Sequence, residues 1–180
     1  MAIALEVYFD DATDTEIHRR WAVLIAAGIP CPLLSSGARP HISLGVARAA
    51  DTAALSIALD AVITTAPIEL TLGSVGAFGT TEGVVFLAPV NSSHLLSWHE
   101  SAWRAFSEYA EDLSLYYAPD GWIPHITMSY GLNTREMAAA IQCLLGLSLP
   151  IVVQPSAIGI VSVRATQLAE IWIKPLIRVG

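Results

Sequence analysis

One five-residue pattern occurs twice in this chain of 180 residues and constrains its fold more than any other feature. Pro40-His41-Ile42-Ser43-Leu44 recurs 84 residues later as Pro124-His125-Ile126-Thr127-Met128. The flanking sequence repeats too, because each copy is followed by a helix start, a proline and a β-branched run. Self-similarity at a fixed offset is typical of a duplicated structural unit. The pattern therefore predicts two copies of one unit.

Prolines downstream of the motifs suggest where these units divide. Pro67 and Pro150 each end a helix, and Pro89 and Pro175 each end a second apolar strand. We expect a single domain of two duplicated lobes over residues 1–180. A unit at roughly 1–80 carries the first motif, a unit at roughly 83–165 carries the second, and a final strand covers 168–174.

Hydrophobic periodicity predicts alternating strands and helices. Strands are expected at 3–9, 41–46, 68–75, 84–90, 125–130, 151–163 and 168–174. Residues 30–40 are expected to form a loop. Helices are expected to begin near a Thr13-x-x-Glu16 capping box, at Asp51 or Thr52, at Ser92 or Ser93, and near an Asn133-x-x-Glu136 capping box.

The expected helices each carry an apolar stripe. The first places Ile17, Trp21, Leu24 and Ile25 on one face, and the helix from Ser92 or Ser93 is expected to continue to Leu113. Short connections at 79–83 and 164–167 favour antiparallel hairpins over crossover connections. The predicted fold class is therefore α+β, with two antiparallel sheets that each carry helices on the outer face.

Composition limits the possible partners. Hydrophobic residues make up 54% of the chain, which is enough for a substantial core. Nine Lys and Arg stand against sixteen Asp and Glu, the net charge is -7, and Lys174 is the only lysine. A protein that follows a long phosphate backbone needs clustered basic residues. The composition therefore argues against long RNA or DNA as the main partner.

Residues 137–163 contain no Asp, Glu, Lys or Arg, as in a membrane span. Pro150 and Pro155 divide this stretch into a helix followed by a strand, so no membrane partner is expected. The first ten residues lack a basic leader and include Glu6, unlike a signal peptide. Cys31 and Cys143 lie far apart, which fits a reducing cytoplasm and gives no disulfide framework.

The repeated motif places an imidazole beside a hydroxyl. Residues i and i+2 of a strand project from the same face, so His41 and Ser43 point together, as do His125 and Thr127. A third His-x-Ser sequence, at 99–101, falls inside a predicted helix, where positions i and i+2 diverge. Only the first two are therefore candidates for a shared site.

On these residues the chain resembles the 2H phosphoesterase superfamily, the RNA 2′,5′-ligase-like and 2′,3′-cyclic phosphodiesterase proteins, which carry two His-x-[Ser/Thr]-x motifs. The segments Gly76-Ala77-Phe78 and Val84 to Leu87 are also similar to the family pattern between the motifs. The resemblance spans essentially the whole chain. It implies a bilobal, pseudo-symmetric fold with both motifs facing a central cleft. Ser43 stands where the family more often has Thr.

The resemblance implies phosphodiester cleavage without a metal or other cofactor. One neutral histidine takes a proton from the attacking water or hydroxyl, and the other, protonated, gives one to the leaving oxygen. Ser43 and Thr127 would donate to the non-bridging phosphate oxygens. The symmetric motifs leave the two roles open, and the family description assigns His125 as base and His41 as acid.

Four further residues are candidates for substrate binding. Arg39 is placed to reach phosphate or to lie in a solvated loop, and Phe78, Trp122 and Tyr130 are candidates to stack on a base or to form core. We read His18, His94 and His99 as structural, because each lies on a predicted helix with no matching partner. No His, Cys, Asp or Glu cluster has metal-ligand spacing.

The leading hypothesis is an enzyme that opens a 2′,3′-cyclic phosphate or cleaves a small nucleotide. Its partner would be a small nucleotide or a short oligonucleotide with a cyclic phosphate. RNA 2′,5′ ligation is a variant of this hypothesis. The alternative from another class is a nucleotide-binding or sensor module without turnover, although a pure binder has no need of two proton-transfer groups.

Overall fold

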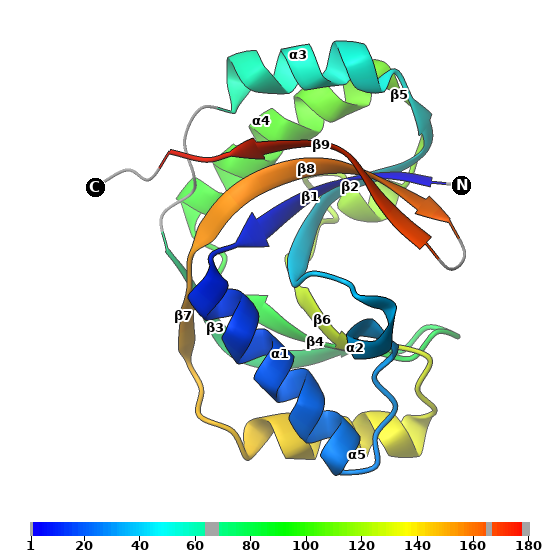
Figure 1. The fold of residues 1–180 in the computed structure, drawn as a ribbon, viewed down its shortest axis with the longest axis vertical. Coiled ribbons are helices and arrows are strands. Elements are labelled where there is room, and N and C mark those ends of the chain that lie inside the picture. The colour runs from blue at the N-terminus through cyan, green and yellow to red at the C-terminus, as the bar shows by residue number, and fades with distance from the viewer. Residues whose placement is uncertain (1, 64–68, 165–166, 178–180) are drawn as a thin grey trace.

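The computed structural model describes residues 2–63, 69–164 and 167–177 (Figure 1). The strands are β1 (Ala2–Phe9), β2 (His41–Ala50), β3 (Leu70–Phe78), β4 (Val84–Pro89), β5 (Ala110–Leu113), β6 (Ile126–Ser129), β7 (Ile151–Val153), β8 (Pro155–Arg164) and β9 (Gln167–Pro175). The helices are α1 (Asp11–Ala26), α2 (Pro32–Ser36), α3 (Thr52–Val62), α4 (Ser93–Tyr109) and α5 (Thr134–Leu145), with a 3₁₀ turn η1 (Leu115–Tyr117). Pro67 and the start of the expected strand at 68–75 lie outside the described residues.

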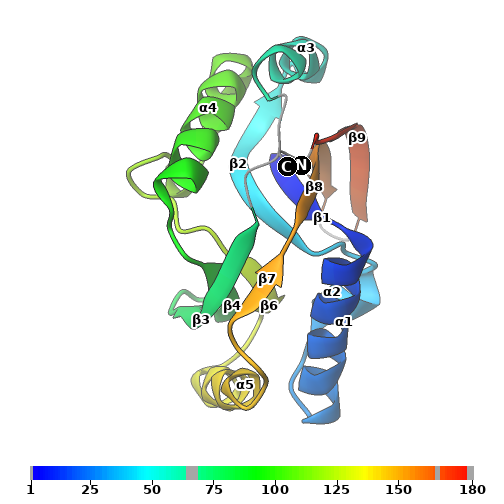
Figure 2. The same ribbon diagram turned by 90° about the vertical axis from the view of Figure 1, so that its left-hand side faces the viewer.

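The strands form two sheets. The first sheet has the order β5-β2-β1-β8-β9, the second has the order β6-β4-β3-β7, and neighbouring strands are antiparallel. Helices α3 and α4 pack on the first sheet, and α1 and α5 pack on the second (Figures 1 and 2). The predicted α+β class with two antiparallel sheets and outer helices is confirmed.

The two sheets exchange strands relative to the expected sequence units. Strand β3, from the unit at 1–80, pairs with β4 in the second sheet, whereas β8, from the unit at 83–165, pairs with β1 in the first. Each unit therefore gives its last strand to the sheet of the other unit. Because of this exchange, β1 and β4 each have a neighbouring strand on both sides, so neither is an open edge of its sheet.

The irregularities of the two sheets repeat as well. Glu6 pairs with Ser43 and Leu5 with Gly45, so Leu44 is an extra residue in β2. Phe86 pairs with Thr127 and Val85 with Ser129, so Met128 is an extra residue in β6. The two bulges are 84 residues apart, the same offset as the motifs. Each β-bulge changes which side chains share a face, so positions 41, 43 and 46 align, as do 125, 127 and 130.

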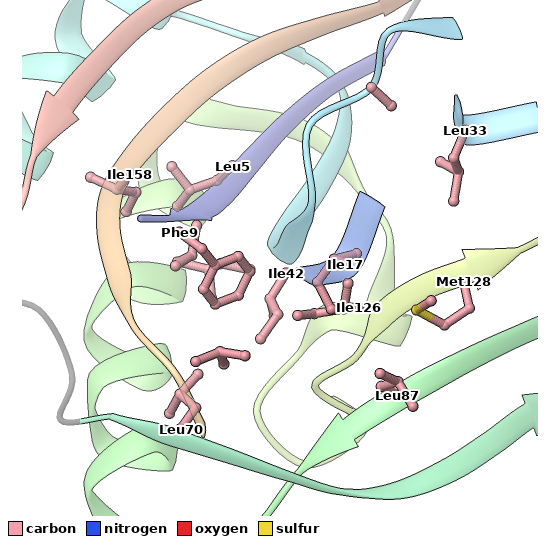
Figure 3. Close-up of a cluster of buried hydrophobic side chains, with 14 of the residues drawn as sticks. Leu5, Phe9, Ile17, Leu33, Ile42, Leu70, Leu87, Ile126, Met128 and Ile158 are labelled. Carbon is pink, nitrogen blue, oxygen red and sulfur yellow. The ribbon is translucent and has the colours of Figure 1, made fainter. Parts of the chain in front are cut away.

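One hydrophobic core joins the helix-covered faces of both sheets. Leu5, Phe9 and Ile158 of the first sheet belong to the same buried cluster as Leu87 and Ile126 of the second (Figure 3). Helix α1 contributes its apolar stripe of Ile17, Trp21 and Leu24 to this cluster. Ile25, expected on the same stripe, is 46% exposed, so that part of the prediction is wrong.

Most helix starts follow the sequence. Asp51 and Ser92 cap α3 and α4, and Asn133 and Glu136 form the expected capping box of α5. The predicted box at Thr13 is wrong. Asp10 caps α1 instead by accepting a hydrogen bond from the Thr13 N–H, because an earlier carboxylate can satisfy the first free amides.

Three other elements differ from expectation. The helix expected to reach Leu113 ends at Tyr109, because residues 110–113 pair with β2 as strand β5. The expected loop at 30–40 contains the short helix α2. The strand expected at 151–163 is two strands in different sheets, β7 and β8, with the break at Gln154. Among the described residues, no helix is long and apolar enough to cross a membrane.

Candidate active site

The two motifs lie on one strand of each sheet and present alternate residues outward. His41 and Ser43 of β2 are half-buried, while Ile42 between them is buried. His125, directly before β6, and Thr127 show the same alternation. The apolar residues anchor each strand in the core and leave the polar pair on the opposite face. In both motifs, the imidazole and the hydroxyl two residues later therefore lie on the same face, as the sequence predicts.

Each motif histidine makes the same local hydrogen bond. Nδ1 of His41 donates to the carbonyl of Arg39 at 2.8 Å, and Nδ1 of His125 donates to the carbonyl of Ile123 at 2.7 Å. A carbonyl can only accept, so Nδ1 carries the proton in both rings. Nε2 is left as the atom that can accept or give a proton. Both side chains are thereby prepared for acid or base chemistry at Nε2.

His125 lies in an aromatic environment. Its ring centroid is 5.0 Å from that of Phe78, nearly edge-on, and 5.1 Å from that of Phe86. Burial lowers the pKa of His125, the carbonyl of Ile123 opposes this change, and the positive charge of His41 lowers the pKa further. The last effect means that the two histidines act on each other across the site. His125 is thus favoured in its neutral form.

His41 has a carboxylate beside it instead. Oε1 of Glu6 lies 3.7 Å from Nε2 of His41, and Oε2 of Glu6 accepts a hydrogen bond from the Tyr8 hydroxyl at 2.9 Å. Burial raises the pKa of Tyr8, and Glu6 raises it further, so Tyr8 remains a donor. The sequence motifs do not indicate Glu6 as a site residue. A signal was present, because Glu6 is the one charged residue in the otherwise apolar strand 2–9.

Tyr117 is a second site residue that the sequence motifs do not indicate. It lies in η1, and its hydroxyl is hydrogen-bonded to the side chain of Ser43. Burial raises the pKa of Tyr117, so the phenol is uncharged at neutral pH. Two indoles also hold the motif strands, since Trp122 donates to the carbonyl of Ser43 and Trp21 to that of Thr127. Both motifs are therefore fixed by hydrogen bonds from outside their strands.

A cavity of about 480 Å³ opens beside His125 and Thr127. Its lining comes from both sheets and from η1, and it is mainly apolar and aromatic: Val46, Phe78, Val84, Tyr116, Tyr117, Ile123 and Tyr130. Thr80, Glu82 and Ser114 add polar groups. The described residues that line it include no lysine or arginine. The cavity suits an uncharged flat group.

The four predicted binding residues have different positions. Phe78 and Tyr130 line the cavity, as a base-stacking role requires. Arg39 does not line it. Its guanidinium lies 4.3 Å from the centroid of the Tyr8 ring, 3.3 Å from Oε1 of Glu170 and 4.0 Å from Oδ2 of Asp14. Arg39 is therefore held by two carboxylates at the side of the site.

Trp122 is not available for stacking on a base. It is 6% exposed, and its ring stacks on that of His99 at 3.7 Å between centroids and 4° between planes. Nε2 of His99 in turn bonds to the carbonyl of Leu44. Burial lowers the pKa of His99 to about 4, so this histidine is neutral and structural, as expected from its place on a helix.

The described part of the chain contains no group of three His, Cys, Asp or Glu side chains that could hold a metal ion. Cys31 is buried and donates from Sγ to the carbonyl of Met128. The chemistry available at the site is that of two imidazoles, two hydroxyls, two phenols and a buried carboxylate.

Comparison with known proteins gives a family match and several solved structures of similar fold. Residues 9–167 match the family described as the 2'-5' RNA ligase superfamily. Among solved structures, E. coli LigT complexed with 3'-AMP has 14% identity and a TM-score of 0.63, with 97% of this chain and 96% of LigT covered. LigT complexed with NADP+ gives 14% identity, a TM-score of 0.59 and coverage of 97% and 96%.

Usb1 of Kluyveromyces marxianus is more distant, with 11% identity, a TM-score of 0.53 and coverage of 97% of this chain and 98% of Usb1. No curated protein sequence gives a significant match. At these identities the solved structures establish a shared fold over nearly the full length.

Proposed function

This chain belongs to the 2'-5' RNA ligase superfamily, the 2H phosphoesterase group that its two motifs resemble, and on that premise we propose a phosphodiesterase with two catalytic histidines. It acts on a 2′,3′-cyclic phosphate or a small nucleotide phosphodiester, and no metal takes part. The observation that carries the proposal is the matched pair of imidazoles. Each is fixed at Nδ1 by a backbone carbonyl, so that Nε2 is the atom available for proton transfer, but the two have different surroundings.

The proton transfers follow from these surroundings. Neutral His125 takes a proton from water at Nε2, and the resulting hydroxide attacks phosphorus. The bond from phosphorus to the 2′ or 3′ oxygen breaks, and Nε2 of protonated His41 gives its proton to that oxygen. The products are a phosphomonoester and a free hydroxyl. Proton exchange with solvent then returns both histidines to their starting states.

Ser43 and Thr127 supply the donors for the phosphate. In each strand the hydroxyl lies on the same face as the histidine two residues before it. Two hydroxyls from opposite sheets can donate to the two non-bridging oxygens, where negative charge is held in the transition state. Tyr117, bonded to Ser43, fixes the orientation of one of these hydroxyls.

The cavity supports a small nucleotide as substrate. Its aromatic lining by Phe78, Tyr117 and Tyr130 suits a nucleobase beside a phosphate held at the histidines. LigT is similar in fold and has been crystallised with 3'-AMP and with NADP+, so this fold accommodates nucleotides. The acidic composition and the lack of basic lining residues favour a mononucleotide or a short oligonucleotide over long RNA.

The test is incubation with 2′,3′-cyclic mononucleotides, cyclic dinucleotides and short RNA with a cyclic-phosphate end, with chromatography of the products. His41→Ala and His125→Ala should each lower turnover by roughly 10² to 10⁴, the usual scale for removing one general acid or base. His94→Ala, on an exposed position of α4, is the matched control and should retain activity.

Other outcomes would redirect the proposal. Wild-type turnover in either motif variant, with an unchanged circular dichroism spectrum, would exclude the two-histidine mechanism. A nucleotide that binds and is recovered intact would support a sensor module instead. Joined RNA products would point to 2′,5′ ligation.

A further inference from the structure

Glu6 and Phe86 occupy equivalent places in the two sheets. Glu6 of β1 pairs with Ser43, and Phe86 of β4 pairs with Thr127. In both sheets the register shift falls directly beside this pair. The third strands match too, because Glu6 pairs with Gly159 of β8 and Phe86 pairs with Gly76 of β3. The repeat therefore offers a direct comparison of what stands beside each histidine.

The residues at these equivalent places differ in charge. Glu6 is 4% exposed, and its carboxylate faces Nε2 of His41 at 3.7 Å. Phe86 is 5% exposed, and its ring packs on His125 at 5.1 Å. Within the described residues, Glu6 has no ion pair with a lysine or arginine, so His41 is the cation within reach of this buried charge. A buried carboxylate is costly unless it is paired.

We propose that Glu6 is a positioning residue that assigns the two histidines their roles: its carboxylate keeps a proton on His41, which becomes the acid, whereas Phe86 leaves His125 neutral as the base. The inference rests on the proposed function, because it concerns the direction of proton transfer at the same site. It goes further by naming the side chain that breaks the symmetry of the two motifs.

The other groups near His41 do not replace this effect. Tyr8, from β1, is an uncharged donor to Glu6, and Tyr117, from η1, is an uncharged phenol. His125, directly before β6, carries no compensating negative charge, and a positive charge on it is disfavoured when His41 is charged. Arg39 precedes β2, but Glu170 of β9 and Asp14 of α1 bind its guanidinium. Glu6 is thus the carboxylate in ion-pair contact with His41.

The first test is the pH dependence of kcat/KM in Glu6→Gln, which keeps the shape of the side chain and removes its charge. The acid limb reports protonation of the base, and the alkaline limb reports loss of the proton from the acid. We expect the alkaline limb to move about one pH unit toward acid, with a tenfold loss of kcat/KM above it, since an opposite charge at this range acts on that scale. The acid limb should stay in place.

Two variants control this result. Glu108→Gln makes the same change at an exposed position of α4 and should leave both limbs where they are in the wild type. Glu6→Asp keeps the charge and should restore the alkaline limb at least in part. An alkaline limb unmoved in Glu6→Gln, or two limbs that move together in that variant, would overturn the assignment.

The second test needs neither turnover nor a folded Glu6→Gln variant. In the wild-type protein, the carboxyl carbon resonance of Glu6 should show a step at the pH where the ring resonances of His41 titrate. His41→Ala should abolish this step, and His125→Ala should keep it. Absence of the step in the wild type would refute the contact between Glu6 and His41. Failure to hydrolyse any substrate, with the step present, would instead refute the proposed function and leave the pairing in place.

Discussion

Gly76 leaves space for the ring that supports His125, and Gly76→Ala tests that support. A Cβ built at Gly76 would lie 2.5 Å from Cζ of Phe86 and closer still to Cε2. The Phe86 ring cannot simply turn away, because it packs between Phe78, at 4.4 Å between centroids, and His125, at 5.1 Å. The added methyl group must therefore displace the rings or the strands.

Overpacking of this kind costs about 1 to 3 kcal/mol of unfolding free energy. For a chain of this length, that cost lowers the melting temperature by about 2 to 12 °C. The effect on catalysis should be larger, because a shift of about 1 Å at a catalytic group can cost roughly 100-fold in rate. We expect a stable but slow enzyme whose loss appears in kcat rather than in KM.

Gly73→Ala is the matched control, because it makes the same change on the same strand with nothing within 4 Å of the added Cβ. It should be neutral or slightly stabilising, since alanine restricts the unfolded chain more than glycine does. Thermal unfolding and steady-state kinetics of both variants check the reasoning. Equal melting temperatures and equal turnover in the two variants would show that Phe86 does not hold His125 in place.

Three other outcomes are expected. Burial lowers the pKa of His99 from 6.5 to about 4. The unfolding free energy should therefore be highest above pH 6.5 and should fall by roughly 3 kcal/mol as the pH drops to 4. Denaturant titrations at several pH values measure this dependence, and His99→Gln should flatten it. Turnover should persist after EDTA treatment, and loss on chelation that zinc or manganese restores would contradict a metal-free mechanism. For RNA of one to about twenty nucleotides that ends in a 2′,3′-cyclic phosphate, KM should change little with length. A KM that falls steadily with length at low salt but not at high salt would instead show a basic surface that binds the phosphate backbone.

Features carried by local sequence were predictable. The motifs, the caps at Asp51, Ser92 and Asn133, and most strands depend on a few neighbouring residues, and the structure places them where the sequence does. The false capping box at Thr13 has the same local origin. Both Asp10 and Thr13 are good N-caps, and the helix begins at the earlier one.

Features that depend on distant contacts were not predictable. No local signal says that β3 joins the second sheet and β8 the first, because that choice depends on which strand flanks β1 or β4. Trp122 was a reasonable candidate for stacking on a base, but His99 from α4 covers its ring. Tyr117 reaches Ser43 through the turn η1, which periodicity does not detect.

The proposed assignment of acid and base also depends on contacts between distant residues. The two motifs are nearly identical, so nothing within them can distinguish the histidines. The distinction lies one strand away, where Glu6 stands 35 positions before His41 and Phe86 stands 39 positions before His125. A duplicated fold gives two equal imidazoles, whereas phosphodiester cleavage needs one protonated and one neutral. In the proposed mechanism, a single difference at a paired strand position provides this contrast, because a carboxylate stabilises an adjacent cation and an aromatic ring disfavours one by desolvation.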